Sequence, residues 1–174
     1  QLSASLDLDH GLNRAMASGL DAVGADLGVT LLVDSESQRL VMRAAIGEGI
    51  DLPPGGRATR FSTGEGLAGW VVEQRTMAMV PDLPQDDRWV VGRDEQRNFR
   101  SALAVPLLVG GQVLGTILLL DRSRDFFREE HLRLVQTAAV QIAQSINNAE
   151  LYAVIREQAE RLGNMLKAQQ VEST

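Results

Sequence analysis

The sequence predicts an α+β domain in which a central antiparallel sheet of five or six strands carries helices on both sides. Three observations support this prediction. Residues 6–23 place apolar side chains at the three- and four-residue spacing of one helix face. A second and longer helical pattern runs from about Arg128 onward. Between the two, short apolar runs are separated by glycine and proline turns, as is typical of antiparallel strands.

The first half of the chain predicts one helix followed by a hairpin. The helix covers residues 6–23, and strands rich in β-branched residues and leucine are predicted over 28–33 and 40–46. Turn-forming residues at 34–37 join the two strands. A segment with two prolines and two glycines, residues 47–60, predicts a loop.

The second half predicts a short helix and three more strands. The helix covers 67–74 and follows Thr63, which is a favourable N-cap residue. Residues 77–80 predict a short strand, whereas 101–109 and 112–120 predict two long strands joined by a glycine pair. Because both long strands are apolar on both faces, we expect each face of the sheet to be covered.

Composition excludes several functional classes. The chain has 174 residues, of which 44% are hydrophobic and 23% charged, so a single globular domain is expected. A net charge of -6 argues against nucleic-acid binding, because phosphate recognition needs a clustered excess of Lys and Arg. The same balance argues against contact with an anionic membrane surface. No apolar run reaches the roughly 20 residues that a membrane helix needs.

The absence of cysteine removes further chemistry. Disulfides, thiolate metal sites and a cysteine nucleophile are excluded, and a reducing cytoplasm is the expected compartment. A Ser-His-Asp set in a usable order and a phosphate-binding Gly-x-x-x-x-Gly-Lys motif are also absent. The two histidines, His10 and His131, have no second ligand at helical spacing. We therefore expect no catalytic residues and no metal site.

One glycine motif needs an explicit interpretation. Gly64, Gly66 and Gly69 fit the spacing of the dinucleotide-binding fingerprint. That fingerprint requires a hydrophobic strand immediately before it, whereas residues 57–62 make a poor strand. We interpret the glycines as close packing at the start of the short helix.

Five segments of the sequence carry a family resemblance. They are the glycine-rich helix entry at 64–71, the loop at 80–89, the hairpin strands at 100–107 and 111–118, and the final helix with its start at 127–130 and its exit at 147–152. Taken in this order, they resemble the GAF domain family over residues 6–152. The resemblance implies an antiparallel sheet with a small-molecule pocket on one face and a helical dimer surface on the other. Members of the family serve as input modules of histidine kinases, cyclases, phosphodiesterases and transcription regulators.

The resemblance implies a domain organisation and a function. Residues 1–25 would form an N-terminal helix, 26–150 the GAF core with the start of the last helix, and 151–174 a signalling helix that leads to an output domain. The implied function is a non-catalytic sensory input domain. It would bind a small molecule and relay its state through a dimeric helix to an output domain such as the histidine kinase of a two-component system. The alternative is a ligand-free scaffold for dimerisation and relay.

Some GAF proteins reduce free methionine sulfoxide with cysteines, and others attach a bilin through one. Neither reaction is available here, so we expect no covalent cofactor and an unidentified non-covalent ligand. Members that bind cyclic nucleotides carry Asn-Lys, Phe and Asp-Glu after the last strand. This chain has Asp121-Arg122, Phe126 and Glu130-His131 at similar spacing, with most identities changed. Cyclic-nucleotide binding is thus a further alternative.

The candidate ligand-binding residues share three kinds of chemistry. Polar residues inside apolar strands need hydrogen-bond partners when buried. Aromatic and methionine side chains suit the lining of a cavity, and arginines pair with anionic ligands. The alternative is that the aromatic and methionine residues belong to the core and the arginines to a hydrated loop. The candidates are Thr30, Trp70, Met77, Met79, Asp82, Trp89, Arg93, Phe99, Arg100, Ser101 and Thr116.

The last helix predicts contact with a second copy of the chain. Its apolar stripe alternates by four and three residues up to Ala149 and then steps back to Tyr152, a stammer that overwinds a coiled coil. Such a helix cannot bury its stripe alone, so we expect a homodimer through the terminal helices. The alternative is a linker that frays in solution. The predicted seam is Val135, Ala139, Ile142, Ile146, Ala149, Tyr152, Ile155, Ala159, Leu162 and Leu166.

Overall fold

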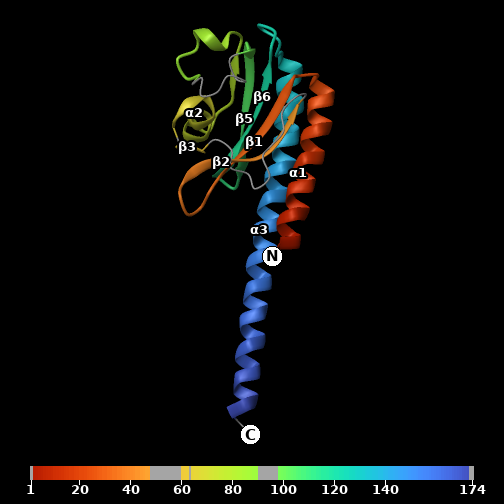
Figure 1. Cartoon of the computed structure of the whole chain (residues 1–174), viewed down its shortest axis with the longest axis vertical. Coiled ribbons are helices and arrows are strands. Elements are labelled where there is room, and N and C mark those ends of the chain that lie inside the picture. The colour runs from red at the N-terminus through yellow and green to blue at the C-terminus, as the bar shows by residue number, and fades with distance from the viewer. Residues whose placement is uncertain (1, 48–59, 63, 90–97, 173–174) are drawn as a thin grey trace.

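The computed structural model describes residues 2–47, 60–62, 64–89 and 98–172. In these ranges the chain forms an antiparallel sheet with helices on both sides, which confirms the predicted fold class (Figure 1). The elements in chain order are α1 (Leu2–Val23), β1 (Leu27–Val33), β2 (Arg39–Gly47), β3 (Arg60–Ser62), α2 (Gly66–Gln74), β4 (Ala78–Val80), the 3-10 turn η1 (Leu83–Gln85), β5 (Ser101–Val109), β6 (Gln112–Asp121) and α3 (Glu129–Glu172).

The sheet has six strands in the described part of the chain, in the order β3-β2-β1-β6-β5-β4. Neighbouring strands are antiparallel, and β1 and β6 lie at the centre, where Val29 faces Leu118 across the pair. The β5–β6 hairpin turns at Gly110 and Gly111, whose φ angles of 53° and 81° are in the left-handed region that glycine tolerates. The predicted glycine-pair hairpin is therefore confirmed.

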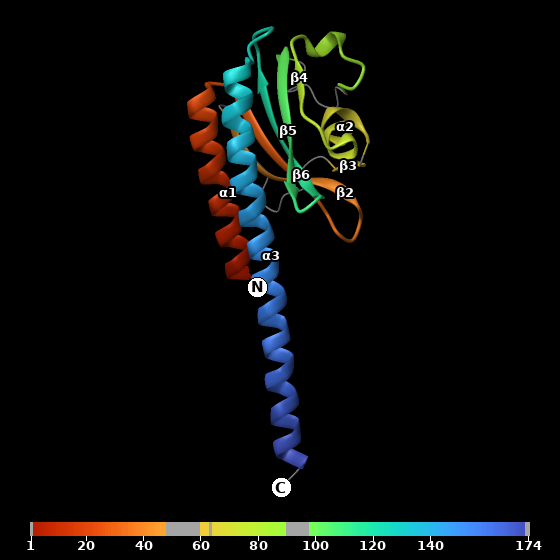
Figure 2. The same ribbon diagram turned by 180° about the vertical axis from the view of Figure 1, so that it is seen from behind.

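The two faces of the sheet are covered differently. Helices α1 and α3 run antiparallel to each other along one face, and α2 lies on the opposite face (Figures 1 and 2). Each face builds its own core. The core beneath α1 and α3 includes Leu12, Met16, Leu20, Leu103, Val105, Leu107, Ile117, Leu119, Val135, Ala139, Ile142 and Ile146. The core beneath α2 includes Val29, Leu31, Leu40, Leu67, Val71, Leu83, Phe99, Ala102, Ala104, Leu118 and Leu120.

Two local features differ from the sequence predictions. Strand β3 lies at the end of the predicted loop and pairs with β2, where Phe61 is opposite Leu40. Three residues are too few for the sequence alone to indicate a strand, so pairing with β2 determines the conformation of β3. The predicted N-cap, Thr63, lies outside the described residues. Helix α2 starts after Glu65, and Glu65 makes no capping bond with its side chain.

Helix α3 consists of two different halves. Its buried residues lie between Val135 and Ile146, where the helix packs against the sheet, and the residues from Glu150 onward are exposed except Gly163. The N-terminal end of α1 lies beside the middle of α3, so the second half of α3 extends past the rest of the molecule (Figure 1). No helix in the described ranges is long and apolar enough to cross a bilayer.

A β-bulge joins the sheet to α1. The β1–β2 register shifts so that Thr30 faces Ala44 while Leu31 faces Met42, which leaves Arg43 as the extra residue. Ala44 belongs to the core beneath α1 and α3, and the Nη2 of Arg43 lies 3.0 Å from Oδ1 of Asp9 on α1. The bulge therefore turns a strand arginine toward the helix.

The closest approach of the two central strands gives a first prediction. A Cβ atom added to Gly115 would collide with the carbonyl oxygen of Leu31 and lie 2.9 Å from Cα of Leu32. Because backbone on β1 cannot yield as a side chain does, we expect Gly115→Ala to lower the free energy of unfolding by about 2–3 kcal/mol. Urea denaturation followed by circular dichroism measures this change.

The matched control is the same substitution at Gly163 on α3, where an added Cβ meets no atom within 4 Å. Alanine there favours the helix, so Gly163→Ala should leave the stability unchanged or raise it by up to about 1 kcal/mol. Equal stabilities for the two variants would show that the β1–β6 approach is not a constraint.

Candidate functional site

Three predicted aromatic residues meet on the face of the sheet beneath α2. Trp70 comes from α2, Trp89 follows η1, and Phe99 precedes β5; all three belong to the α2-side core or pack against it. Phe99 is buried, whereas both tryptophans are only half buried. The guanidinium carbon of Arg88 lies 4.4 Å from the centroid of the Trp70 ring. This face therefore presents partly exposed aromatic surface, which suits the binding of planar molecules.

A local ion pair holds Arg88 over this aromatic surface. Its Nε and Nη2 lie 2.9 and 2.6 Å from the two carboxylate oxygens of Asp86, and its backbone N–H donates to Asp86 Oδ1. The side-chain hydrogen bonds from Arg88 lower the pKa of Asp86, and the same contact raises the pKa of Arg88. Both groups are charged at neutral pH, so the guanidinium stays in place over Trp70.

Arg100, one of the two predicted anion-binding arginines, is paired with an aspartate of its own chain. Arg100 donates from Nε and Nη2 to Oδ1 of Asp82, at 3.3 and 3.2 Å. The other carboxylate oxygen of Asp82 lies 3.5 Å from Nε of Arg124, a contact that no sequence pattern predicted. Arg93 lies outside the described residues. Asp82 therefore uses both of its oxygens to join two arginines from different segments.

The two predicted threonines lie on opposite faces. Thr116 is fully buried among residues of the α2 side, and its hydroxyl donates to the carbonyl oxygen of Val105 at 2.9 Å. Thr30 is also fully buried, but it points toward α1 and α3, as its neighbours Ala44 and Ile117 show. Its Oγ1 has no hydrogen-bond partner among the described residues.

The remaining candidates also face α1 and α3. Met77 and Met79 pack against the core beneath these helices, and buried Ser101 donates to the carbonyl oxygen of Ser123 at 2.6 Å. The predicted ligand-binding set is therefore divided by the sheet, and its members do not line one common pocket. Trp70, Trp89, Phe99 and Thr116 lie on the α2 side, Asp82 and Arg100 at the start of β5, and Thr30, Met77, Met79 and Ser101 on the side of α1 and α3.

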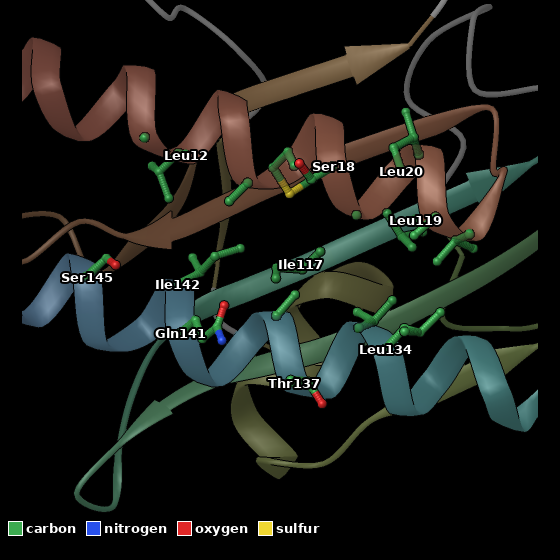
Figure 3. Close-up of a pocket in the computed structure, with 18 of the residues that line it drawn as sticks. Leu12, Ser18, Leu20, Ile117, Leu119, Leu134, Thr137, Gln141, Ile142 and Ser145 are labelled. Atoms are coloured by element: carbon green, nitrogen blue, oxygen red, sulfur yellow. The ribbon is translucent and has the colours of Figure 1, made fainter.

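A groove with a volume of about 830 Å³ lies between α1 and α3. Figure 3 shows that side chains from α1, α3 and β6 line it, among them Leu12, Ile117 and Leu134. Many residues of its wall are small, so the two helices leave room between them. No sequence pattern had predicted that α1 lines this groove. The available signal was the spacing of small residues at Gly11, Ala15, Ser18, Gly19 and Ala22.

The structure corrects the first part of the predicted dimer seam. Val135, Ala139, Ile142 and Ile146 are between 1% and 5% exposed, because they pack against the sheet of their own domain. They belong to the core of their own domain, although Val135 and Ile142 also line the floor of the groove between α1 and α3. The strict alternation of four and three residues reflects this intramolecular contact.

The second part of the seam lies on a different side of the helix. Ala149 and Tyr152 line the groove, and Ile155, Leu162 and Leu166 are 64%, 60% and 62% exposed. At 3.6 residues per turn the exposed stripe is rotated by roughly 150° from the core stripe. The three-residue step in the pattern is thus the place where α3 changes from packing on its own sheet to exposing a second apolar face.

The residues that resemble the cyclic-nucleotide pattern make contacts with one another or with neighbouring loops. Asp121 accepts a hydrogen bond from the backbone N–H of Ser123, and the backbone N–H of Arg122 donates to Asp26. The Phe126 ring stacks on His131 with centroids 5.5 Å apart. In the described ranges no group of three or more His, Asp or Glu residues is arranged to hold a metal ion.

Comparison with known proteins agrees with this geometry. The family model described as "GAF domain" matches residues 5–147. Among curated proteins, the chain is similar to "Probable 3',5'-cyclic phosphodiesterase pde-5" of Caenorhabditis elegans, with 22% identity over 164 residues. That alignment covers 90% of this chain but only 22% of the relative, so this chain corresponds to a small part of that protein.

Solved structures share the fold. The GAF domain of a phosphoenolpyruvate-protein phosphotransferase from Coxiella burnetii superposes with a TM-score of 0.77 at 23% identity, covering 84% of this chain and 86% of that one. A type II free methionine-R-sulfoxide reductase from Thermoplasma acidophilum gives 0.71 at 16% identity, with 83% and 96% covered. The family model covers most of the sequence. The chain therefore belongs to the GAF domain family.

Proposed function

We propose that this GAF domain is a sensory input module that binds a small molecule beneath α2 and transmits its state through α3 to an output domain such as a histidine kinase. The observation that carries the proposal is α3 itself. It is one 44-residue helix whose first half is part of the domain core and whose second half leaves the domain with an apolar stripe exposed. A rigid element of this kind is suited to carry a displacement away from the fold.

The central strands offer a route from one face to the other. In β6, Leu118 and Leu120 pack under α2, while Ile117 and Leu119 pack under α1 and α3. A ligand that displaces α2-side residues would therefore shift strands whose opposite side holds the helices. Two half-buried tryptophans support a planar ligand on the α2 side.

A second copy of the chain is the proposed partner of the helical side. The groove residues Ala149 and Tyr152 lead directly into the exposed stripe of Ile155, Leu162 and Leu166. The groove and the stripe form one continuous apolar face, and contiguous exposed apolar surface of this kind marks an interaction site. A parallel homodimer would bury both parts and place two outgoing helices side by side.

The ligand proposal predicts a change in stability. The 174-residue chain should be screened by thermal shift against metabolites, with cAMP and cGMP included because the nematode relative is a probable cyclic phosphodiesterase. A specific ligand at one hundred times its dissociation constant should stabilise the protein by about 2.7 kcal/mol. A panel without any stabilising compound would favour the ligand-free scaffold.

Two candidate residues from opposite faces serve as a matched pair for any compound found. Trp89→Ala should abolish the shift, because Trp89 packs on the α2 side, whereas Met79→Ala should retain it. Loss of the shift in Met79→Ala alone would place the site beneath α1 and α3 and contradict the proposal.

The dimer proposal predicts opposite results for two adjacent residues of α3. Ile155 lies on the exposed stripe and Val154 lies beside it on another side of the helix, with 64% and 54% exposure. Glutamate at position 155 would place a charge in the seam, so we expect Ile155→Glu to raise the dimer dissociation constant by at least about tenfold. Sedimentation equilibrium should find Val154→Glu within about twofold of the wild type. The same loss in both variants, or a monomeric wild type, would argue against this seam.

A further inference from the structure

We propose that residues 122–128, which connect β6 to α3, form a coupling element that Asp82 ties to the loop bordering the α2 side. A displacement of that loop would then reach the first turn of α3 directly, in addition to any path through the sheet. The proposal rests on the proposed function, because it concerns how a ligand signal would reach α3. The attachment of the loop to residues 122–128 can itself be measured without a ligand.

The loop after β4 is bonded to this connection at two adjacent residues. The backbone N–H of Asp125 donates to the carbonyl oxygen of Pro81 at 2.8 Å. Next to it, Oδ2 of Asp82 lies 3.5 Å from Nε of Arg124. Asp125 has a φ of 51°, in the left-handed region that a non-glycine residue seldom adopts without support from its surroundings. The connection is therefore held in one conformation by this loop.

The same loop is also bonded to the start of β5. Oδ1 of Asp82 accepts both hydrogen bonds from the guanidinium of Arg100, and the backbone N–H of Leu83 donates to the carbonyl oxygen of Arg100 at 2.7 Å. Arg100 in turn donates from its backbone to Asp121, the last residue of β6, at 2.8 Å. Asp82 thus uses one oxygen for the sheet and the other for the connection to α3.

The other side of the loop faces the candidate ligand site. Leu83 is fully buried in the α2-side core together with Phe99, and Arg88 reaches over Trp70 of α2. A displacement of Leu83 or Arg88 would displace the short segment that contains Asp82. Leu83 directly follows Asp82 in the chain, so we expect a displacement of Leu83 to be passed to the partners of Asp82.

The connection is fixed at its other end as well. The backbone N–H of Arg122 donates to Oδ2 of Asp26, which lies between α1 and β1, at 2.9 Å. The guanidinium carbon of Arg122 also lies 5.1 Å from the centroid of the Phe99 ring. The end of α1, the start of α3 and the α2-side loop therefore meet at one corner of the molecule.

The test compares two aspartates of the same loop. Asp82 and Asp86 have similarly shielded side chains, with 15% and 17% exposure, and each is paired with arginine. Asp82 bonds to β5 and to the α3 connection, whereas the Arg88 partner of Asp86 is only two residues away. Asp82→Asn and Asp86→Asn each remove one negative charge with little change of size, but only the first removes an ion pair to the connection.

Hydrogen exchange of the 174-residue protein provides the readout. We expect Asp82→Asn to accelerate exchange of amides 124–132 by about fivefold and Asp86→Asn to stay within about twofold of the wild type. Amides of β1 and β6 should keep their wild-type rates in both variants. Equal acceleration in the two variants, no acceleration in Asp82→Asn, or a uniform acceleration that includes β1 would overturn the proposal.

A second measurement tests the transmission itself. Leu83→Ala opens a cavity in the α2-side core, and it should accelerate exchange of amides 124–132 in the wild-type background. In the Asp82→Asn background the same substitution should add less than twofold at these amides. Equal increments in both backgrounds would contradict a relay through Asp82. Neither measurement involves a ligand or a dimer, so a negative ligand screen and a failed relay are separate results.

Discussion

The structure depends first on the pairing of β1 with β6. These strands are buried on both faces, and each supplies side chains to both cores: Leu118 to the α2 side, and Leu119 to the side of α1 and α3. Neither face can be exposed to water without losing the burial that stabilises the sheet. The two backbones come close enough at Leu31 that only glycine fits at position 115. The helices on both sides are therefore coupled to the same two strands.

Helix α3 combines two roles that require different sides of one helix. Its first half completes the core through residues such as Ile142 and Ile146, whereas its second half exposes Ile155 and Leu162. Because the helix is continuous over 44 residues, the position of its far end follows from how its first turns sit on the sheet. Small changes in that packing are enlarged along its length. This is the physical reason to regard α3 as the output of the domain.

In a chain with a net charge of -6, the arginines serve as ties between segments. Arg43 joins β2 to α1 through Asp9, Arg122 joins the end of β6 to Asp26, and Asp82 gathers Arg100 and Arg124. Partly exposed ion pairs of this kind contribute little stability individually. These ion pairs instead hold the connecting segments in position, because each pair joins segments that are far apart in sequence.

The periodicity of the sequence determined most of the fold. The spacing of apolar residues located α1, α3 and the long strands to within a few residues, because burial on a helix or strand imposes its own repeat. The glycine pair at Gly110 likewise placed the β5–β6 turn. These features are local, and they can be read without knowing what lies across the fold. The three-residue strand β3 was missed because its conformation depends on β2.

The tertiary structure decided which face each candidate residue occupies. The sequence identified Trp70, Met79 and Thr30 as one set, but the strand pairing places Met79 and Thr30 on the side of α1 and α3, opposite Trp70. The apolar stripe of α3 was visible in the sequence, yet only packing assigned Val135 to the core and left Ile155 exposed. A periodic pattern shows only that apolar residues recur at a given spacing. What it packs against is set by contacts between distant segments, which no local pattern contains.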